Sequence, residues 1–275
     1  LVVTVAEPSM EAVGRMMEHP QVTLLCATGG PGVVRAVLSS GKKAIGAGAG
    51  NPPVVVDETA DIEKAAKAII DGCSFDNNLP CIAEKECIVV DQVADYLIFQ
   101  MQKYGAYLIE DRETITRLRD LVVTETGAPN KAFIGKDAHV ILKGIGIDVG
   151  PEIRTIICET PGNHVFAEEE LMMPILPIIR VNDVEEAMKL GVKLEKGLRH
   201  TAMIHSKNID TLTEFARVIQ TTILVKNGPS YAGIGVGGEG YTTFTIAGPT
   251  GEGLTSASAF TRKRRCVLVD GFAIR

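Results

Sequence analysis

The chain contains no tryptophan, and aromatic residues make up only 5% of its 275 residues. Apolar residues nevertheless amount to 45%, so the core must consist mainly of aliphatic side chains. Such a core is typical of α/β folds, in which valine- and isoleucine-rich parallel strands are buried on both faces. The length is sufficient for one large domain or for two smaller ones.

The six cysteines lack the spacing of a metal site or of a redox motif. No two of them are separated by two residues, and none belongs to a Cys/His pattern typical of zinc, so no metal site is expected. A chain of this size does not depend on disulfides, and a reducing cytoplasm is therefore the expected compartment. The six are Cys26, Cys73, Cys81, Cys87, Cys158 and Cys266.

Positive charge and long apolar runs are also scarce. The net charge is −6 and the pI is about 5.5, which argues against nucleic acid as a partner. No apolar run is long enough to span a membrane, so no membrane partner is expected. Positive charge is concentrated in one basic cluster, Arg262–Arg265. We expect it to be a solvated face or an ion-pair network, with contact to a phosphorylated ligand as the alternative.

Predicted helices and strands alternate from residue 91 to about residue 225, which indicates an α/β fold with a parallel or mixed sheet and helices on both faces. Residues 1–50 predict the order β-α-β-α-β, beginning with a strand over Leu1–Val5. The glycine-rich segment Gly228–Gly253 is expected to be a long loop, and Arg265–Val269 is expected to end the chain as a strand. The other predicted strands are Val22–Cys26, Lys42–Gly46, Val54–Val56, Glu86–Val90, Thr155–Cys158, Ile175–Val181, Thr201–His205 and Thr222–Val225.

Two glycine-rich segments flank the third predicted strand. Thr28–Gly32 is a tight turn between a strand and a helix, which is an anion-binding geometry, although many such turns only reverse the chain. It does not match GxGxxG, and no acidic residue follows the next strand, so the ordinary dinucleotide fingerprint is not met. Gly46–Pro53 consists of small residues that permit close backbone approach, and it also suits a domain junction.

The polar loop Asp76–Ala83, between a predicted helix and a predicted strand, contains Cys81. A thiol on a short loop held by rigid elements is well placed to act as a nucleophile. Asn77, Asn78 and the backbone N–H of Cys81 could donate hydrogen bonds to a developing oxyanion. The alternative is that Cys81 is an ordinary small buried residue under a turn.

The histidines are weaker candidates for a functional site than Cys81. His164, His200 and His205 have no partner spacing for a metal or for a Cys–His pair. His205 ends a predicted strand and is expected to be structural, whereas His164 is a candidate for lining a cleft. Cys73 and Cys87 are expected to be buried.

Several segments resemble the aldehyde dehydrogenase superfamily, and more narrowly the CoA-acylating aldehyde dehydrogenases of bacterial ethanolamine and propanediol utilisation. The resemblance covers essentially the whole chain, and the cysteine loop and the Glu-Glu-Leu-Met-Met-Pro segment are its most specific parts. The matching stretches are Thr28–Gly32, Gly46–Pro53, Asn77–Cys81, Asn163–His164, Glu169–Pro174, Arg199–Ala202 and Thr245–Gly253.

The resemblance implies the oxidation of a short aliphatic aldehyde, with NAD as cofactor and coenzyme A as co-substrate. Cys81 would attack the aldehyde to give a thiohemiacetal, and hydride transfer to NAD would leave a thioester. Glu170 matches the glutamate that binds the ribose next to nicotinamide, with a surface charge as the alternative. Gly29 and Gly30 match the turn near the pyrophosphate.

One departure from the family concerns water activation. Hydrolytic members carry a glutamate in the segment that matches Gly46–Pro53, but the matching residue here is Ala47, and no acid lies between Lys43 and Asp57. General-base activation of water needs such a group, so its absence favours transfer to the thiol of CoA. The alternatives are a hydrolytic or phosphorylating aldehyde dehydrogenase, or a non-catalytic partner-binding protein that retains the fold.

The resemblance also implies an organisation with two lobes and Cys81 in the cleft between them. A catalytic α/β domain over residues 51–245 would follow the second half of a Rossmann-like nucleotide-binding domain over residues 1–50. A return segment and a C-terminal strand would occupy residues 246–275. The expected ligands are a small aldehyde, NAD and CoA.

A second departure is length. A whole family member has a further N-terminal half of the nucleotide domain, with an asparagine that helps to bind the oxyanion, and a microcompartment-targeting peptide. The present chain alone is therefore expected to bind NAD weakly. The complete protein is expected to be a homo-oligomer, in the cytoplasm or inside a bacterial microcompartment whose shell the N-terminus would contact.

Overall fold

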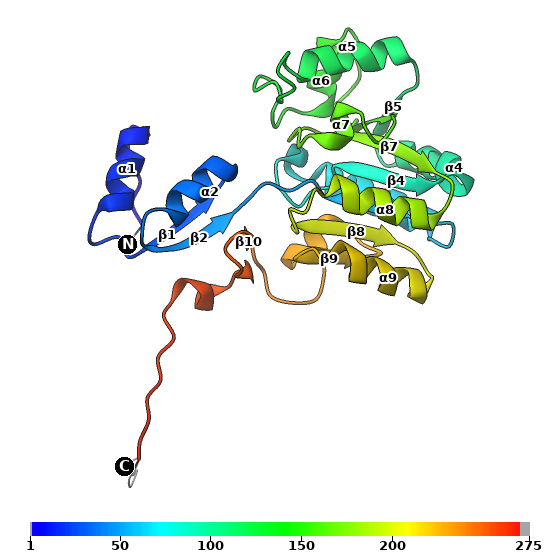
Figure 1. The fold of residues 1–275 in the computed structure, drawn as a ribbon. Helices are drawn as coiled ribbons and strands as arrows, with labels where there is room; N and C mark the ends of the chain where they lie inside the picture. The colour runs from blue at the N-terminus through cyan, green and yellow to red at the C-terminus, as the bar shows by residue number, and fades with distance from the viewer. Residues whose placement is uncertain (1, 270–275) are drawn as a thin grey trace.

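The computed structural model describes residues 2–269, and its main feature is a seven-stranded sheet (Figure 1). Every pair of neighbouring strands in this sheet is parallel, so the expected parallel or mixed sheet is parallel. In sheet order the strands are β5 (Ala106–Ile109), β6 (Thr155–Glu159), β7 (Ile175–Val181), β4 (Glu86–Val90), β3 (Pro53–Val56), β8 (Thr201–His205) and β9 (Ile223–Lys226).

Helices cover both faces of the sheet because successive strand side chains point to opposite sides. Val54 and Val56 of β3 belong to the apolar cluster of α3 (Ile62–Cys73) and α4 (Asp91–Lys103). Val55 between them belongs instead to the cluster of α8 and α9 on the other face. These two helices are Val184–Leu194 and Ile209–Ile219.

A third apolar cluster lies at the β5 end of the sheet. It joins side chains of β5 and β6 to three helices, which are α5 (Arg112–Val122), α6 (Ala138–Gly144) and α7 (Val165–Glu168). In Figure 1, α5 and α6 lie above the sheet in green, while α7 lies beside β7.

Most of the longer helices begin where a side-chain oxygen accepts a hydrogen bond from a backbone N–H of the first turn. This cap satisfies one of the donors that lack a partner within the helix. It is the local reason why these helices begin where they do. The capping residues are Ser9 of α1 (Met10–Glu18), Asp61 of α3, Asp111 of α5, Asp183 of α8 and Asn208 of α9.

A smaller lobe contains α1, α2 (Pro31–Leu38) and the parallel pair β1 (Leu24–Thr28) and β2 (Lys43–Ala47). The late part of the chain returns to this lobe. The N–H of Gly46 donates to Thr250 Oγ1 at 3.1 Å, and Lys43 Nζ donates to the carbonyl oxygen of Ala259 at 3.0 Å. The returning segment contains η2 (Ser230–Ile234), the antiparallel pair β10 (Ile246–Ala247) and β11 (Gly253–Leu254), and η3 (Ala257–Phe260).

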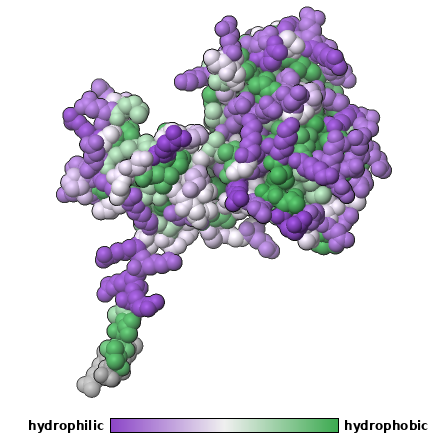
Figure 2. Space-filling view, in the orientation of Figure 1, coloured by the Kyte–Doolittle hydropathy of each residue, from purple (hydrophilic) through white to green (hydrophobic). Residues whose placement is uncertain are grey.

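Two strands expected at the ends of the chain are not formed. Residues 2–5 of the predicted strand Leu1–Val5, and all of Arg265–Val269, are exposed and pair with no strand among residues 2–269. A strand needs a neighbour for its backbone hydrogen bonds, which apolar β-branched residues alone do not provide. The basic cluster before the second segment is exposed as well, and Figure 2 shows it as hydrophilic atoms followed by a hydrophobic stretch.

Strand β5 was not predicted from the sequence. It follows α4 after only Tyr104 and Gly105, and Gly105 turns the chain with a φ of 96°. A positive φ of this size is readily adopted only by glycine. Because the turn is so short, the sequence pattern contains no clear boundary between the helix and the strand.

The packing of α9 on the sheet gives a test of this architecture. Phe215 is 0% exposed, so Phe215→Ala should lower the free energy of unfolding by about 3–5 kcal/mol through the cavity that it leaves. Phe99 on α4 is 54% exposed, and Phe99→Ala should change the same quantity by less than about 1 kcal/mol. Urea unfolding followed by circular dichroism measures both, and equal losses would contradict the described core.

Candidate active site

The predicted nucleophile and three residues near it lie at the amino ends of strands in the main sheet. Gly50 precedes β3, Cys81 precedes β4, Glu170 precedes β7 and His200 precedes β8. Because these strands are parallel, their preceding loops meet at one edge of the sheet. In Figure 1 the arrows of β7 and β8 point away from the lobe that contains β1 and β2, so this edge faces the smaller lobe.

A cavity of about 680 Å³ lies between this edge and the smaller lobe. The smaller lobe and the segment that leaves it contribute Thr28, Gly29, Gly30, Gly48 and Ala49. The rest of the lining consists of Asp76, Leu79, Pro80, Cys81, Ile82, Glu170, Met172, Ile234, Phe244 and Thr245. The structure therefore brings Cys81, Glu170, Gly29 and Gly30 together, as the sequence predicted.

The loop before Cys81 has an unusual backbone. Asp76, Asn77 and Asn78 have φ values of 46°, 52° and 65°, in the left-handed region that Asn and Asp tolerate better than most residues. These residues lie in η1 (Phe75–Asn78), directly after α3. The asparagine-rich sequence thus allows the chain to turn sharply between α3 and Cys81.

Asn78 does not take the expected role of oxyanion donor. Its side chain is 1% exposed, and Nδ2 donates to the carbonyl oxygens of Cys73 and Glu84, both at 2.9 Å. Asn77 Nδ2 likewise donates to the Gly135 carbonyl oxygen at 3.1 Å and to Asp137 Oδ1 at 2.6 Å. Both side-chain amides donate to groups of the protein itself and thereby hold the loop in place. The sequence does not reveal the direction in which these amides point.

Cys81 differs from the other described cysteines by lining this cavity. Burial raises the pKa of its thiol, and the charge of Glu170 raises it further. Lys85 and the backbone N–H of Cys81 itself act in the opposite direction. The expected burial of Cys73 and Cys87 is confirmed, and burial raises the pKa of Cys73 to about 12. Cys81 is therefore the thiol best placed to meet a ligand.

Glu170 is half-buried in the same cavity. Burial raises the pKa of its carboxyl group, while Lys85 and the backbone N–H of Gly50 lower it. Gly29 and Gly30 stand across the cavity, where Gly30 begins α2 and the N–H of Gly29 donates to the Ala47 carbonyl oxygen at 3.0 Å. A glycine turn and a carboxylate facing one cavity suit a ligand with phosphate and sugar hydroxyl groups.

Gly50 allows the closest approach in the site. A Cβ atom on Gly50 would lie 2.5 Å from the Cys81 carbonyl oxygen and 3.0 Å from Cγ of His200. No side chain fits there, so the Gly50 backbone packs directly against the cysteine loop. Ala47 is buried, and the carboxylates that line the described cavity are Asp76 and Glu170.

The sequence analysis missed two residues near this site. His200 is 3% exposed, and burial followed by the charge of Lys85 lowers its pKa to about 4, so its ring is neutral at pH 7. Its Nδ1 lies 2.9 Å from Thr201 Oγ1, while Nε2 has no partner in the described part of the chain. Lys85 is buried as well. No sequence pattern marks His200 or Lys85 as part of the site, because the fold determines how deeply each side chain is buried and which way it points.

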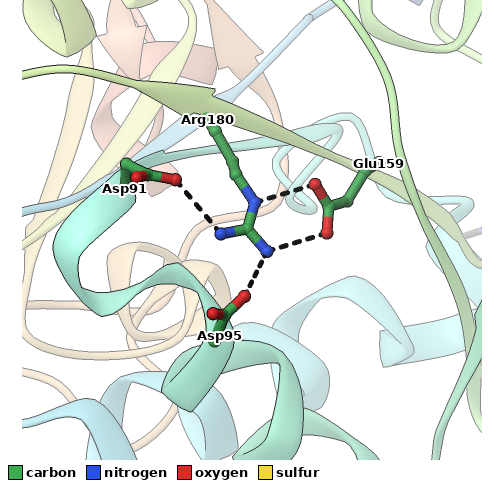
Figure 3. Close-up of polar contacts among 4 residues, drawn as sticks. All are labelled: Asp91, Asp95, Glu159 and Arg180. Carbon is green, nitrogen blue, oxygen red and sulfur yellow. Dashed lines mark hydrogen bonds and ion pairs between the residues drawn. The ribbon is translucent and has the colours of Figure 1, made fainter.

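The opposite edge of the sheet carries a different polar cluster (Figure 3). Arg180 donates to both carboxylate oxygens of Glu159 at 2.8 Å, to Asp91 at 3.1 Å and to Asp95 at 2.5 Å. These carboxylates raise the pKa of Arg180 and occupy its donors. The candidate His164 lines the adjoining cavity of about 610 Å³ and does not line the Cys81 cavity.

Other kinds of site find no support in the residues that the structure describes. No group of three or more His, Cys, Asp or Glu side chains among residues 2–269 is placed to hold a metal ion. None of the helices in that range combines the length and the apolar character needed to cross a bilayer.

Comparison with known proteins identifies the family to which the chain is similar. The chain matches the aldehyde dehydrogenase family over residues 1–253. It is 54% identical over its whole length to the propanal dehydrogenase (CoA-propanoylating) of Salmonella typhimurium, and it spans 59% of that protein.

Two solved structures are also similar. One is the Rhodopseudomonas palustris propionaldehyde dehydrogenase with bound CoA and an acylated cysteine, at 60% identity and a TM-score of 0.95, over 97% of this chain and 60% of the other. The second is the propionaldehyde dehydrogenase of the Clostridium phytofermentans fucose utilisation bacterial microcompartment, at 56% identity and a TM-score of 0.93. This alignment covers 98% of this chain and 62% of that one.

The charge of Glu170 gives a prediction about Cys81. Glu170→Gln should lower the pKa of Cys81, because the carboxylate disfavours the thiolate, and a larger thiolate fraction at pH 7 should speed alkylation by iodoacetamide roughly two- to tenfold. Glu169→Gln, at an exposed neighbouring position outside the cavity, should leave the rate unchanged. Mass spectrometry of the Cys81 peptide measures both rates. Slower or unchanged alkylation in Glu170→Gln would contradict the electrostatic description.

Proposed function

Because the chain belongs to the aldehyde dehydrogenase family, we propose that it carries out the CoA-dependent oxidation of a short aliphatic aldehyde to an acyl-CoA. The observation that carries the proposal is one cavity that holds Cys81, Glu170 and the turn at Gly29 and Gly30. The similar Rhodopseudomonas palustris enzyme, with its bound CoA and acylated cysteine, supports the same chemistry.

Cys81 supplies the nucleophile in this proposal. Its thiolate attacks the carbonyl carbon of the aldehyde and forms a thiohemiacetal, in which the former carbonyl oxygen carries the negative charge. The amides of Asn77 and Asn78 are occupied, so within the described chain the backbone N–H of Cys81 remains as the proposed donor to this oxygen. Oxidation of the thiohemiacetal carbon leaves an acyl group on Cys81 as a thioester.

The residues that face the cavity suit a nicotinamide cofactor. Gly29 and Gly30 have no side chain that would keep a pyrophosphate from the backbone at the start of α2, and Glu170 is placed to accept hydrogen bonds from ribose hydroxyls. NAD, when bound, would supply the hydride acceptor for the oxidation.

Transfer of the acyl group to CoA follows from what the site contains. The segment from β2 to β3, where hydrolytic relatives carry a general base, has no carboxylate before Asp57. Asp57 lies beyond the far end of β3, where it is buried and accepts hydrogen bonds from Thr59 and Ser206. In the proposed deacylation the CoA thiolate attacks the thioester carbon, the bond to Cys81 breaks, and Cys81 leaves as a thiolate.

We also propose the wider setting that the resemblance implied. Association with a bacterial microcompartment is supported by the similar enzyme from the fucose utilisation microcompartment. A short aldehyde as substrate is supported by the propanal and propionaldehyde dehydrogenases. Homo-oligomer formation stays a prediction.

The role of Cys81 leads to a first functional prediction. In the complete protein, Cys81→Ser should reduce CoA-dependent aldehyde oxidation by several orders of magnitude, because a hydroxyl without an adjacent base is a far weaker nucleophile than a thiolate. Cys26→Ser is the matched control, since Cys26 is exposed on β1 and lies outside the cavity, and its activity should match that of the unmodified protein. NADH formation measured with propanal and CoA tests both. Substantial turnover by Cys81→Ser would refute the assignment.

The fate of the thioester leads to a second functional prediction. With aldehyde and NAD but no CoA, the complete protein should form at most one NADH per site and then nearly stall, because general-base assistance worth about 10²–10⁴-fold is absent for water. Addition of CoA should restart NADH formation and yield acyl-CoA. Stopped-flow absorbance and chromatography of the products distinguish the outcomes. Steady formation of free acid at the CoA-dependent rate would favour the hydrolytic alternative instead.

A further inference from the structure

Lys85 is a buried cation without a close counter-charge. It immediately precedes β4 and is 3% exposed. Its Nζ donates to Oδ1 of Asn78 at 2.6 Å and to the Asn78 carbonyl oxygen at 3.0 Å. No carboxylate of residues 2–269 lies within ion-pair distance of this ammonium group. Burying an ammonium group against neutral acceptors is costly, so stability alone is a poor reason for its presence.

The two glutamates beside Lys85 in the sequence do not provide that counter-charge. Glu84 Oε1 accepts a hydrogen bond from the N–H of Ser230 at 2.9 Å. Glu86 Oε1 lies 3.5 Å from Nδ2 of Asn51. One oxygen of each carboxylate is therefore directed at another part of the fold, and neither glutamate forms an ion pair with Lys85.

The charge of Lys85 also acts on the groups around the Cys81 cavity. Burial lowers the pKa of Lys85, and the nearby groups that act in the opposite direction are Glu170, which is the strongest, followed by Cys73, Cys81 and Glu86. In return, Lys85 lowers the pKa values of Cys81, Glu170 and His200, and also those of Cys73, Glu84 and Glu86. The charged and titratable groups facing it from neighbouring elements are Cys73, Cys81, Glu84, Glu86, Glu170 and His200.

We propose that Lys85 is a positioning residue whose fixed positive charge favours the thiolate of Cys81, and that Asn78 holds its ammonium group in place. The two hydrogen bonds from Nζ both end on Asn78, three residues before Cys81, so the cation and the nucleophile are fixed by the same loop. Burial and Glu170 both oppose ionisation of Cys81, and a nearby cation offsets them.

The proposal deepens the proposed function, and rests on it for its meaning in catalysis. There the Cys81 thiolate appears twice, as the attacking group and as the group released when CoA takes the acyl chain. A thiolate that is easier to form is also a better leaving group. One fixed charge would therefore assist both half-reactions without contacting the substrate.

The test is the pH profile of Cys81 alkylation by iodoacetamide, which requires no aldehyde, NAD or CoA. Lys85→Gln removes the charge but retains an amide donor that can reach Asn78, and Lys85→Arg retains the charge. Lys85→Gln should raise the apparent pKa of Cys81 by about one unit and slow alkylation at pH 7 about tenfold. Lys85→Arg should stay close to the unmodified protein.

Three controls separate the effect of charge from that of structure. Circular dichroism establishes that each variant is folded, and alkylation of the exposed Cys26 should be the same in all of them. Lys143→Gln removes a cation at an exposed position on α6 and should leave the Cys81 profile unchanged. A purely structural role predicts that Lys85→Gln retains the profile, and this result in the folded variant would overturn the proposal.

Asn78→Asp provides an independent variant if Lys85→Gln does not fold. It places a carboxylate at the position that accepts the 2.6 Å hydrogen bond from Nζ and pairs the charge of Lys85. The apparent pKa of Cys81 should again rise, and a profile equal to that of the unmodified protein would refute the proposal. Because the readout is alkylation, it stays informative even when CoA-dependent oxidation is absent. Failure of the proposed function and failure of this inference are thus distinguishable.

Discussion

Every strand of the main sheet runs in the same direction, so the loops that precede β3, β4, β7 and β8 meet at a single edge. Gly50, Cys81, Glu170 and His200 are far apart in the sequence but each lies on one of these loops. In open parallel sheets, ligands more often bind at the carboxyl ends of the strands. Here that edge is occupied by the Arg180 network, and the cavity lies at the amino ends, facing the smaller lobe.

This arrangement explains which parts of the molecule the sequence could predict. Buried strands such as Glu86–Val90 and Ile175–Val181 were predicted with correct bounds, because continuous apolar runs between capped helices are a strong local signal. Cys81, Glu170, Gly29 and Gly30 were found through motifs that the family shares. The strands predicted at the two ends of the chain were wrong, because strand formation depends on a neighbouring strand that no local pattern specifies. Asn78 was placed in the right loop with the wrong role, because only the fold decides where its amide points.

The misassigned Asn78 connects the local structure to the chemistry of the site. Its amide hydrogens bind the carbonyl oxygens on either side of the cysteine loop, and its two oxygens accept from Lys85. A single polar side chain therefore fixes both the backbone before Cys81 and the cation that affects its ionisation. A buried polar group of this kind stabilises the protein only when all of its hydrogen bonds are made, and here they are.

The charges in the cavity must satisfy two demands that oppose each other. A carboxylate at Glu170 suits the hydroxyl groups of a ribose, yet the same negative charge makes the neighbouring thiolate harder to form. Water could solvate both charges, but a half-buried site excludes much of it, so the protein itself must supply the balancing field. A lysine held at a distance achieves this better than one in contact with Glu170, since a direct ion pair would neutralise the carboxylate and leave little field at Cys81. The absence of an ion pair at Lys85 within the described chain is thus a condition for its charge to reach the nucleophile.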